Sequence, residues 1–264
     1  MAPNILFSII IPTRHRLPLL QRAIESINIQ DYGNLEIIVI DNASDEPLTK
    51  HDISTNHSLT IIRNSTQLSA SANRNLGARH AAGNIITFLD DDDELLPGKF
   101  SAHAEAFAKH PEAEFVYSNT RHIGPKNETL TISSGPPEMT PFLKFRYIHL
   151  NAFSVKKYIF DTMSFNEDMQ SFGDVEFVGR LLRRGKAVHV PKLHAIWYRD
   201  NRDDQITRKN WRRSYKNWRI LCDQFNEEIM ADRSLRHLYH RKMFILSVMF
   251  FDTRQAIQSF PKTI

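Results

Sequence analysis

The chain has 264 residues, of which 41% are hydrophobic, so it can bury the core of one large domain or of a domain with an appendage. The formal net charge is +4, and the single cysteine, Cys222, excludes an internal disulfide and a cysteine-based zinc site. No run of about 18 apolar residues is available to span a membrane, and Pro12 comes too early for a signal peptide, so a reduced, cytoplasmic setting is expected.

Strands and helices are expected to alternate through the N-terminal third of the chain. Four short runs are apolar and rich in β-branched residues, as strands buried on both faces are. Two segments with helical spacing, 17–29 and 69–82, lie between these strands, and Gly83 follows the second where a helix would end. This alternation predicts βαβ units and a mainly parallel sheet. The expected strands are residues 7–11, 36–40, 59–63 and 85–89.

The rest of the chain mixes further strands and helices with one long polar segment. Residues 120–140 contain glycine and proline and are expected to form an exposed loop. From residue 205 onward the spacing is helical, and Trp218, Phe225 and Ile229 recur on one face that is expected to pack into the core. The remaining expected helices are residues 98–110, 142–149 and 175–184, and the remaining strands are residues 114–119, 151–155, 187–190 and 195–199.

Polar side chains follow three of the N-terminal strands at the point where each strand ends. Thr13 follows the first strand, Asp41 follows the second, and four consecutive aspartates, 90–93, follow the fourth. Open α/β sheets bind their ligands at the carboxyl ends of the strands, so this placement predicts a nucleotide site. Neither a G-x-G-x-x-G nor a G-x-x-x-x-G-K-[ST] loop is present, so the phosphate charge must be met in another way.

The aspartate run 90–93 is the most informative feature of the sequence. Four adjacent carboxylates repel one another unless a cation lies among them, and hard cations such as Mg2+ and Mn2+ take oxygen ligands. Mg2+ usually binds one or two carboxylates together with substrate phosphates. A solvated acidic loop is the alternative, but the buried strand that precedes the run favours a metal–phosphate site.

Five motifs, which together cover roughly residues 5–200, resemble the inverting GT-A glycosyltransferases of family 2. The resemblance implies an α/β fold of the GT-A (nucleotide-diphospho-sugar transferase) type, which is Rossmann-like, with a central, mainly parallel sheet and a helical C-terminal extension. The motifs are Ser-Ile-Ile-Ile-Pro-Thr (8–13), Leu-Glu-Ile-Ile-Val-Ile-Asp-Asn-Ala-Ser-Asp (35–45), Ala-Asn-Arg-Asn-Leu-Gly-Ala (72–78), Ala-Gly-Asn-Ile-Ile-Thr-Phe-Leu-Asp-Asp-Asp-Asp (82–93), and Phe-Asn-Glu followed by Gly-Asp-Val-Glu-Phe-Val-Gly-Arg-Leu within 165–181.

The resemblance implies roles for three residues on the nucleotide side of the site. Thr13 matches the threonine that lines the nucleotide pocket, and Asp41 matches the aspartate that hydrogen-bonds the base, usually uracil. Arg74 matches the arginine that contacts the base or the phosphates. Each has a structural alternative, because Asp41 also suits a turn and Arg74 also suits an ion pair on a helix surface.

The aspartate run matches the D-x-D motif of the family. Asp90 and Asp92 match its two carboxylates, so Asp92 is expected to bind Mn2+ or Mg2+ and Asp90 to approach the ribose or the sugar. Asp91 shares the cluster, so the register of the motif is open. His194 is a candidate further metal ligand, because some family members add a histidine from the C-terminal part. Asn201 stands where that histidine often occurs, and Asp200 and Asp203 are alternatives.

Asp174 falls where the family keeps its catalytic base. A carboxylate base takes the proton from an acceptor hydroxyl, which makes the hydroxyl more nucleophilic. Its neighbours Glu167, Asp168 and Glu176 are competitors for the role, and Asp174 near a helix start would also favour the helix dipole.

The motifs divide the chain into expected domains. A GT-A domain is expected at 1–200, with a nucleotide-binding half at 1–96 and an acceptor-binding half at 97–200, and a helical C-terminal extension at 201–264. Basic residues gather over 199–219, so this region could contact an anionic membrane leaflet peripherally.

The hypothesis that follows is a metal-dependent, inverting hexosyl- or N-acetylhexosaminyl-transferase. Its donor is expected to be a nucleotide-diphosphate sugar, which the resemblance implies is a UDP-sugar, and its acceptor a glycan or lipid-linked glycan of a bacterial surface polysaccharide or lipopolysaccharide. A sugar nucleotidyltransferase is the alternative enzyme, although it would carry a glycine-rich loop after the first strand. A nucleic-acid-binding module is the alternative outside enzymes, and four aspartates facing a phosphate ligand argue against it.

Overall fold

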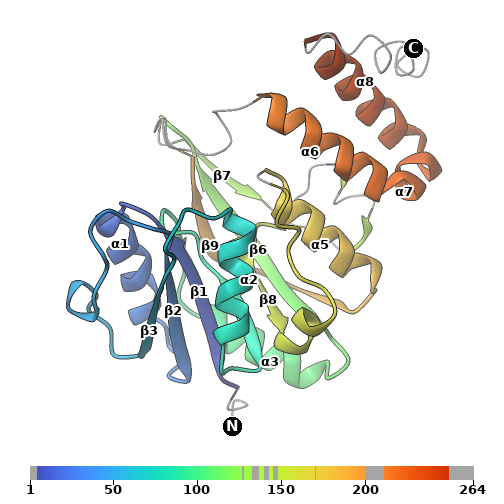
Figure 1. Ribbon diagram of the computed structural model, residues 1–264. Helices are drawn as coiled ribbons and strands as arrows, with labels where there is room; N and C mark the ends of the chain where they lie inside the picture. The colour runs from blue at the N-terminus through green and yellow to red at the C-terminus, as the bar shows by residue number, and fades with distance from the viewer. Residues whose placement is uncertain are drawn as a thin grey trace.

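The computed structural model describes residues 5–126, 128–132, 137–139, 143–144, 148–169, 171–199 and 211–249 (Figure 1). Within these residues, nine strands form one sheet in the order β3-β2-β1-β4-β8-β6-β9-β5, and β7 pairs with β6. The strands are β1 (Phe7–Thr13), β2 (Leu35–Asp41), β3 (Ser58–Arg63), β4 (Ile85–Phe88), β5 (Glu94–Leu95), β6 (Phe115–Ile123), β7 (Thr129–Ile132), β8 (Phe153–Lys156) and β9 (Ala187–Tyr198).

The N-terminal part of the sheet is parallel. Strands β3, β2, β1 and β4 run in the same direction, and Thr13 at the end of β1 lies in register with Asp41 at the end of β2. The carboxyl ends of β1, β2 and β4 therefore meet at one edge of the sheet. Beyond β4 the sheet becomes mixed, because β8 is antiparallel to both β4 and β6, whereas β9 is parallel to β6.

Helices cover both faces of the sheet (Figure 1). Ile9 and Ile11 of β1 belong to an apolar cluster with α1 and α3, whereas Ile10 between them belongs to a second cluster with α2 and α5. This alternation is the period of two that a strand buried on both faces requires. The helices are α1 (Leu17–Asn28), α2 (Ala70–His80), α3 (Lys99–Lys109), α5 (Gly173–Arg183), α6 (Trp211–Gln224), α7 (Asn226–Ala231) and α8 (Arg233–Met249), with short 3-10 turns at Lys50–Asp52, Leu150–Ala152 and Lys157–Asp161.

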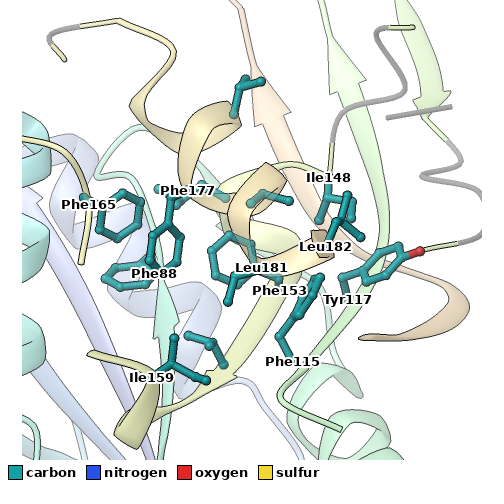
Figure 2. Packing of buried hydrophobic residues seen from close by; sticks show 14 of the residues in the cluster. Phe88, Phe115, Tyr117, Ile148, Phe153, Ile159, Phe165, Phe177, Leu181 and Leu182 are labelled. Atoms are coloured by element: carbon teal, nitrogen blue, oxygen red, sulfur yellow. The ribbon is translucent and has the colours of Figure 1, made fainter. Parts of the chain in front are cut away.

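Aromatic rings fill the second cluster, where α5 packs on the sheet (Figure 2). Phe177 of α5 stacks on Phe165 with 4.1 Å between the ring centroids, and Phe88 of β4 meets Phe165 edge-on at 5.1 Å. Offset and edge-to-face pairs of this kind add about 0.5–1.5 kcal/mol each beyond their buried area. The residues before α5 are thereby fixed against the last buried residue of β4, directly below the aspartate run.

The C-terminal helices α6, α7 and α8 share a buried apolar cluster with α5. Trp218, Phe225 and Ile229 are buried, as their spacing predicts, and Trp218 stacks on Tyr239 of α8 with 4.7 Å between the ring centroids. In the part of the chain that the structure describes, no helix combines the length and the apolar character that crossing a membrane requires.

Two expectations from the sequence are wrong in their boundaries. Residues 120–140 are not all loop, since β6 continues to Ile123 and pairs with β7 in a hairpin. The two strands expected over 187–190 and 195–199 are one strand, β9, whose pairing with β6 shifts register around Asn119. Pro191 lies at this irregularity, where a residue without an N–H group is tolerated.

Other expectations fall partly or wholly outside the described residues. The helix expected over 142–149 is one, and its described end, residues 148–149, is not helical. Asp200, Asn201, Asp203 and most of the basic stretch 199–219 also lie outside, as does the chain beyond 249. The expected boundary between the GT-A domain and its C-terminal extension stays a prediction.

Candidate active site

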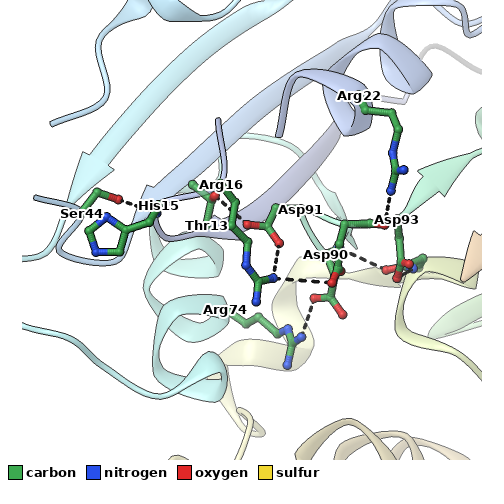
Figure 3. Close-up of polar contacts among 11 residues, drawn as sticks. Thr13, His15, Arg16, Arg22, Ser44, Arg74, Asp90, Asp91 and Asp93 are labelled. Carbon is green, nitrogen blue, oxygen red and sulfur yellow. Dashed lines mark hydrogen bonds and ion pairs between the residues drawn. The ribbon is translucent and has the colours of Figure 1, made fainter. Parts of the chain in front are cut away.

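The four aspartates lie just beyond β4, at the edge where the carboxyl ends of β1 and β2 also meet (Figure 3). Their side chains differ in exposure. The side chain of Asp90 is 33% exposed and that of Asp92 is 17% exposed, whereas that of Asp91 is 6% exposed. Asp93 is buried at 1%. The run therefore presents its first and third carboxylates at the surface of the site and turns the second and fourth inward.

Asp91 is held inside the site by two donors. The Thr13 hydroxyl donates a hydrogen bond to Asp91 Oδ2 at 2.7 Å, and Arg16 Nη1 donates to Asp91 Oδ1 at 3.1 Å. Burial raises the pKa of Asp91 to about 6, against the opposing effects of Arg16 and Thr13. The structure thus brings Thr13 to the aspartate run, while the role of Thr13 in a nucleotide pocket stays a prediction.

Two arginines pair with the outward carboxylates of the run, and a third contacts its backbone. Arg16 Nη1 also lies 3.5 Å from Asp92 Oδ2, and Arg74 Nη2 donates to Asp90 Oδ1 at 2.6 Å (Figure 3). Arg22 of α1 donates to the backbone carbonyl of Asp92 at 2.5 Å. Arg74 therefore forms an ion pair, the alternative that the sequence left open, and its contact with a base or a phosphate stays a prediction.

Asp93 is part of the support beneath the site. Its Oδ2 accepts a hydrogen bond from Asn151 Nδ2 at 2.5 Å, and its Oδ1 accepts from the Tyr198 backbone N–H at 2.9 Å. Asn151 Oδ1 in turn accepts from the Asp90 backbone N–H at 3.2 Å. Burial raises the pKa of Asp93 well above its usual range. These bonds tie both ends of the aspartate run to the turn before β8 and to the end of β9.

Asp41 is fully buried at the end of β2. Its Oδ1 accepts the Ser44 backbone N–H at 3.0 Å and its Oδ2 accepts that of Leu48 at 3.3 Å. These contacts are those of a turn-forming aspartate, the alternative that the sequence left open. A contact between Asp41 and a nucleobase remains a prediction.

Asp174 lies in the first turn of α5 and is partly exposed. The segment before it is bound to α2, the helix that also carries Arg74, because the Asn75 side chain donates to the Phe165 carbonyl at 2.9 Å and to Glu167 at 2.8 Å. Phe172, which precedes the helix, has a left-handed backbone with a φ of 62°. Strained residues of this kind persist only where the surroundings fix them.

Contacts from α6 supply that restraint on the Phe172 turn. The Asn217 side chain donates to the Ser171 carbonyl at 3.1 Å, and the Phe172 ring meets Trp218 edge-on with 5.7 Å between the centroids. Of the competitors for the role of base, Glu176 is buried and paired with Arg180 at 2.6 Å. Asp174 is the carboxylate of this helix start that stays accessible.

His194 is a residue of β9, and its ring lies among buried basic groups on the side of the sheet that α3 covers. Its ring meets His103 of α3 with 5.9 Å between the centroids, and the backbone N–H of Leu96 donates to its carbonyl at 2.9 Å. Burial lowers the pKa of His194 to about 4, and the positive charges of Lys99 and Lys192 act in the same direction. No contact with the aspartate run is among these, so the ligand role of His194 stays a prediction.

The donor set fits a divalent cation that is shared with a phosphate ligand. Among the described residues, no three histidine, cysteine or carboxylate side chains are grouped so that they could hold a metal ion by themselves. Asp92 and Asp90 offer hard oxygen atoms at the surface of the site, which suits Mg2+ or Mn2+ bound by one or two carboxylates and completed by phosphate and water.

Several residues of the site were not found from the sequence. Arg16 precedes α1 and Arg22 lies within it, so basic residues soon after the first strand were an available signal. Asn151 gave no such signal, because it is 58 residues from the Asp93 that it binds.

Comparison with known proteins agrees with this architecture. The family model described as glycosyl transferase family 2 matches residues 8–184. A GalNAc(5)-diNAcBac-PP-undecaprenol beta-1,3-glucosyltransferase of Campylobacter jejuni is 32% identical over 242 residues, which cover 86% of this chain and 76% of that protein. A glycosyltransferase of Haemophilus influenzae is 29% identical over 185 residues, which cover 67% of this chain and 62% of that protein.

Solved structures share the fold at lower identity. Staphylococcus aureus TarS 1–349 in complex with UDP-GlcNAc superposes with a TM-score of 0.70 and 16% identity, covering 98% of this chain and 78% of that one. TarS 1–349 in complex with UDP gives a TM-score of 0.64, also at 16% identity, covering 89% of this chain and 71% of that one. The expected GT-A fold is confirmed, and the chain belongs to glycosyl transferase family 2.

Proposed function

We propose that this glycosyltransferase moves a sugar from a nucleotide-diphosphate donor to an acceptor hydroxyl with inversion, in a reaction that depends on a divalent metal. The observation that carries the proposal is the alternating exposure of the aspartate run, which offers Asp90 and Asp92 to the site and buries Asp91 and Asp93. This alternation supports a D-x-D motif read as Asp90 and Asp92.

The donor side has to neutralise the charge of a leaving nucleoside diphosphate. Mn2+ or Mg2+ held by Asp92, with Asp90 beside it, would supply a Lewis acid for the diphosphate oxygens. The guanidinium groups of Arg16 and Arg74 already lie against these carboxylates and can hydrogen-bond phosphate oxygens in the same geometry. Thr13 fixes Asp91 and Asn151 fixes Asp93, so the outward carboxylates keep their directions.

The acceptor side needs a base. Asp174 is proposed to take the proton from the acceptor hydroxyl while that oxygen attacks the anomeric carbon and the diphosphate departs from the opposite face. A single displacement forms no covalent sugar–enzyme intermediate and inverts the anomeric configuration, so one base is sufficient. Base catalysis of this kind contributes about 10²–10⁴-fold to the rate.

A UDP-hexose or UDP-N-acetylhexosamine is proposed as the donor and a lipid-linked glycan as the acceptor. The TarS structures that share this fold hold UDP and UDP-GlcNAc, and the C. jejuni relative is named for glucosyl transfer to an undecaprenol-linked glycan. The product would enter a bacterial surface polysaccharide or lipopolysaccharide. No nucleic-acid partner is proposed.

A lipid-linked acceptor suggests a peripheral position on the cytoplasmic leaflet. Helix α8 exposes Ile245 and Val248, whose exposed fractions are 47% and 52%, and carries Arg233, Arg236 and Arg241 as well. Apolar and cationic side chains on one helix are the combination that anionic membrane surfaces attract. Sedimentation with vesicles of phosphatidylglycerol, but not of phosphatidylcholine, is the expected result, and equal binding or no binding to both would contradict the peripheral contact.

A thermal-shift panel tests the proposed chemistry. UDP, GDP, CDP and dTDP are each added with and without Mn2+, and UDP with Mn2+ is expected to raise the Tm most. Asp92→Asn should remove the part of the shift that needs Mn2+ and abolish transfer while the apo Tm is kept. Asp161→Asn, an exposed carboxylate on a 3-10 turn, is the matched control and should behave as the wild type. A nucleotide shift that is independent of Mn2+ in the wild type would contradict metal dependence.

A further inference from the structure

Three aromatic side chains form a wall beside the aspartate run. Trp197 of β9 contacts both His122 and His149, with 4.6 Å and 4.9 Å from its ring centroid to theirs and interplanar angles of 32° and 31°. His122 and Trp197 are partners in the β6–β9 register, and His149 precedes the 3-10 turn Leu150–Ala152. These three residues are called the aromatic wall below.

Hydrogen bonds of its sequence neighbours place the aromatic wall at the site. Tyr198, next to Trp197, donates its backbone N–H to Asp93, and Asn151, two residues after His149, accepts from the backbone N–H of Asp90. The electrostatics agree with this position. Burial is the main influence on His149 and lowers its pKa. The negative charges of Asp90 and of Asp174, the proposed base, oppose that shift, so both carboxylates act on His149 electrostatically.

Two nitrogen atoms of the aromatic wall are buried without a hydrogen-bond partner among the described residues. They are His149 Nδ1 and His122 Nε2. Two other buried or half-buried histidines are satisfied, since His103 contacts Ser154 at 2.9 Å and His189 contacts Asn119 at 2.9 Å, whereas His194 Nδ1, away from the aromatic wall, also lacks a partner among the described residues. A buried polar atom without a partner destabilises the fold, and such an atom in a native fold calls for an explanation. A ligand that supplies hydroxyl groups would give both nitrogens a partner.

The combination of an indole face with flanking imidazole nitrogens suits a sugar ring. A pyranose has an apolar C–H face that can pack on an aromatic ring, and hydroxyl groups around its edge that can donate to or accept from imidazole. Ligand sites commonly join aromatic surface to a few placed polar groups in this way. We propose that the aromatic wall is a sugar-ring subsite, with Trp197 as the platform and His149 and His122 as hydroxyl partners. The proposal rests on the proposed function, and its ligand is the hexopyranose of either the donor or the acceptor.

Four variants test the subsite. Trp197→Leu removes the π face, whereas Trp197→Phe keeps one, and His149→Ala removes a hydroxyl partner and its ring contact with Trp197 but keeps the indole. His189→Ala is the matched control, because its imidazole stacks on Tyr117 at 4.9 Å in the same strand pair but is already hydrogen-bonded to Asn119. Thermal unfolding of each variant checks the fold, and if Trp197→Leu does not fold, Trp197→Phe and His149→Ala still decide the outcome.

Calorimetry with Mn2+ present measures the sugar contribution in two arms. The first compares UDP with UDP-glucose and UDP-GlcNAc, and the second titrates methyl glycosides of glucose, GlcNAc and GalNAc into the protein saturated with UDP. Trp197→Leu is expected to lose the sugar-dependent affinity at least tenfold in one arm while the Kd for UDP changes less than twofold. Trp197→Phe is expected to stay within threefold, and His149→Ala to lose three- to tenfold.

The arm that responds identifies the source of the sugar ring. A loss confined to the UDP-sugars assigns the subsite to the donor, and a loss confined to the glycosides assigns it to the acceptor. Sugar binding that is unchanged in Trp197→Leu and His149→Ala, or a wild type that binds UDP with no sugar-dependent affinity in either arm, overturns the subsite. A wild type that does not bind UDP at all overturns the proposed function instead.

Discussion

The aspartate run and the C-terminal helices are fixed to the same sheet by different interactions. Charged and polar bonds hold the aspartate run, from Arg16, Arg74 and Asn151. Aromatic packing holds the C-terminal helices, where Trp218 is buried against Tyr239 and lies under the Lys242 ammonium at 3.6 Å from its ring centroid.

The two kinds of interaction have different effects on the molecule. Hydrogen bonds and ion pairs depend on angle and distance, so those around the aspartate run set where its carboxylates point. Apolar burial has no direction and stabilises in proportion to the area removed from water. Changes near the run should therefore alter chemistry and binding, whereas changes in the C-terminal helices should alter stability. Phe172 connects the two regions, because α6 packs on the turn that carries Asp174.

The largest effect is expected at Asp174. Asp174→Asn should lower kcat by about 10²–10⁴-fold, because an amide cannot take the acceptor proton. The Kd for UDP with Mn2+ should be unchanged. Asp168→Asn is the control, since Asp168 is exposed on the same approach to α5 and was a competitor for the role. Initial rates with saturating donor check the prediction, and full activity of Asp174→Asn with loss in Asp168→Asn would move the base to Asp168.

Asn151 and Trp218 offer the sharpest contrast between the two regions. Asn151→Ala leaves the buried Asp93 without one hydrogen bond and should cost about 1–3 kcal/mol of unfolding free energy. Because Asn151 also holds the Asp90 backbone, the affinity for UDP with Mn2+ should fall as well. Trp218→Ala should cost about 3–5 kcal/mol by leaving a cavity, with the affinity for UDP with Mn2+ unchanged.

Urea unfolding and calorimetry on both variants measure these two quantities, and Asn84→Ala, an exposed amide just before β4, is the control. Equal loss of nucleotide affinity in the Asn151 and Trp218 variants would remove the distinction between the regions.

A pH-dependent effect is expected at Glu114, which lies before β6 and is nearly fully buried. Arg184, Lys186 and Tyr158 donate to its carboxylate, and the Arg184 hydrogen bond is the main reason that its pKa falls from 4.5 to about 2. A lowered pKa in the folded state stabilises the fold above pH 4.5, and this stabilisation is lost as the pH falls toward 2. Because solvent screens the partly exposed basic groups, its size is about 2 kcal/mol.

The measurement is urea unfolding of the wild type and Glu114→Gln between pH 7 and pH 3. The difference between them should shrink by more than half over that range. Glu112→Gln, an exposed carboxylate nearby, should show no such difference. A constant difference between Glu114→Gln and the wild type would assign the effect to packing instead of charge.

The smallest effects are expected from one change made in both regions. A Cβ at Gly77 of α2 would lie 2.4 Å from Ile10 Cγ2, and one at Gly179 of α5 would lie 2.3 Å from Phe225 Cζ. Overpacking lowers the free energy of unfolding by about 1–3 kcal/mol, and the higher helix propensity of alanine offsets about 1 kcal/mol of that loss. Gly77→Ala should also weaken UDP binding, because α2 carries Arg74, whereas Gly179→Ala should displace only the C-terminal helices.

Tm and UDP affinity distinguish the two glycine variants. Gly33→Ala, where a Cβ would meet nothing within 4 Å, should be neutral in both measurements. A stabilised Gly77→Ala variant would show that Ile10 has room to move.

Much of the fold was predictable because its pattern is local. The strand over 7–11 lies within β1, and the helix over 69–82 contains α2, since buried strands and capped helices are defined by neighbouring residues. The β6–β7 hairpin was missed because its strands are polar and partly exposed, as Arg121 and His122 are, so no apolar run marks them.

The residues of the candidate site also divide into those that the sequence predicts and those that it does not. Asp90, Asp92 and Asp174 could be proposed from motifs and from the position of each residue after a strand or at a helix start. Asn151, His149 and Trp197 could not, because their partners lie far away in the sequence and depend on how β6, β8 and β9 are ordered in the sheet. No local rule connects a residue to a partner that the strand order brings beside it.

Short segments of the sequence were sufficient to predict a family 2 glycosyltransferase and the position of its acidic motif, because motif and period are properties of neighbouring residues. Which two aspartates face outward depends on contacts between distant residues, since the turn after β4 and the bonds from Thr13 and Asn151 set each side chain's direction. The position of Trp197 and two histidines beside them likewise depends on the fold, because two paired strands and the turn before β8 bring these rings to one place.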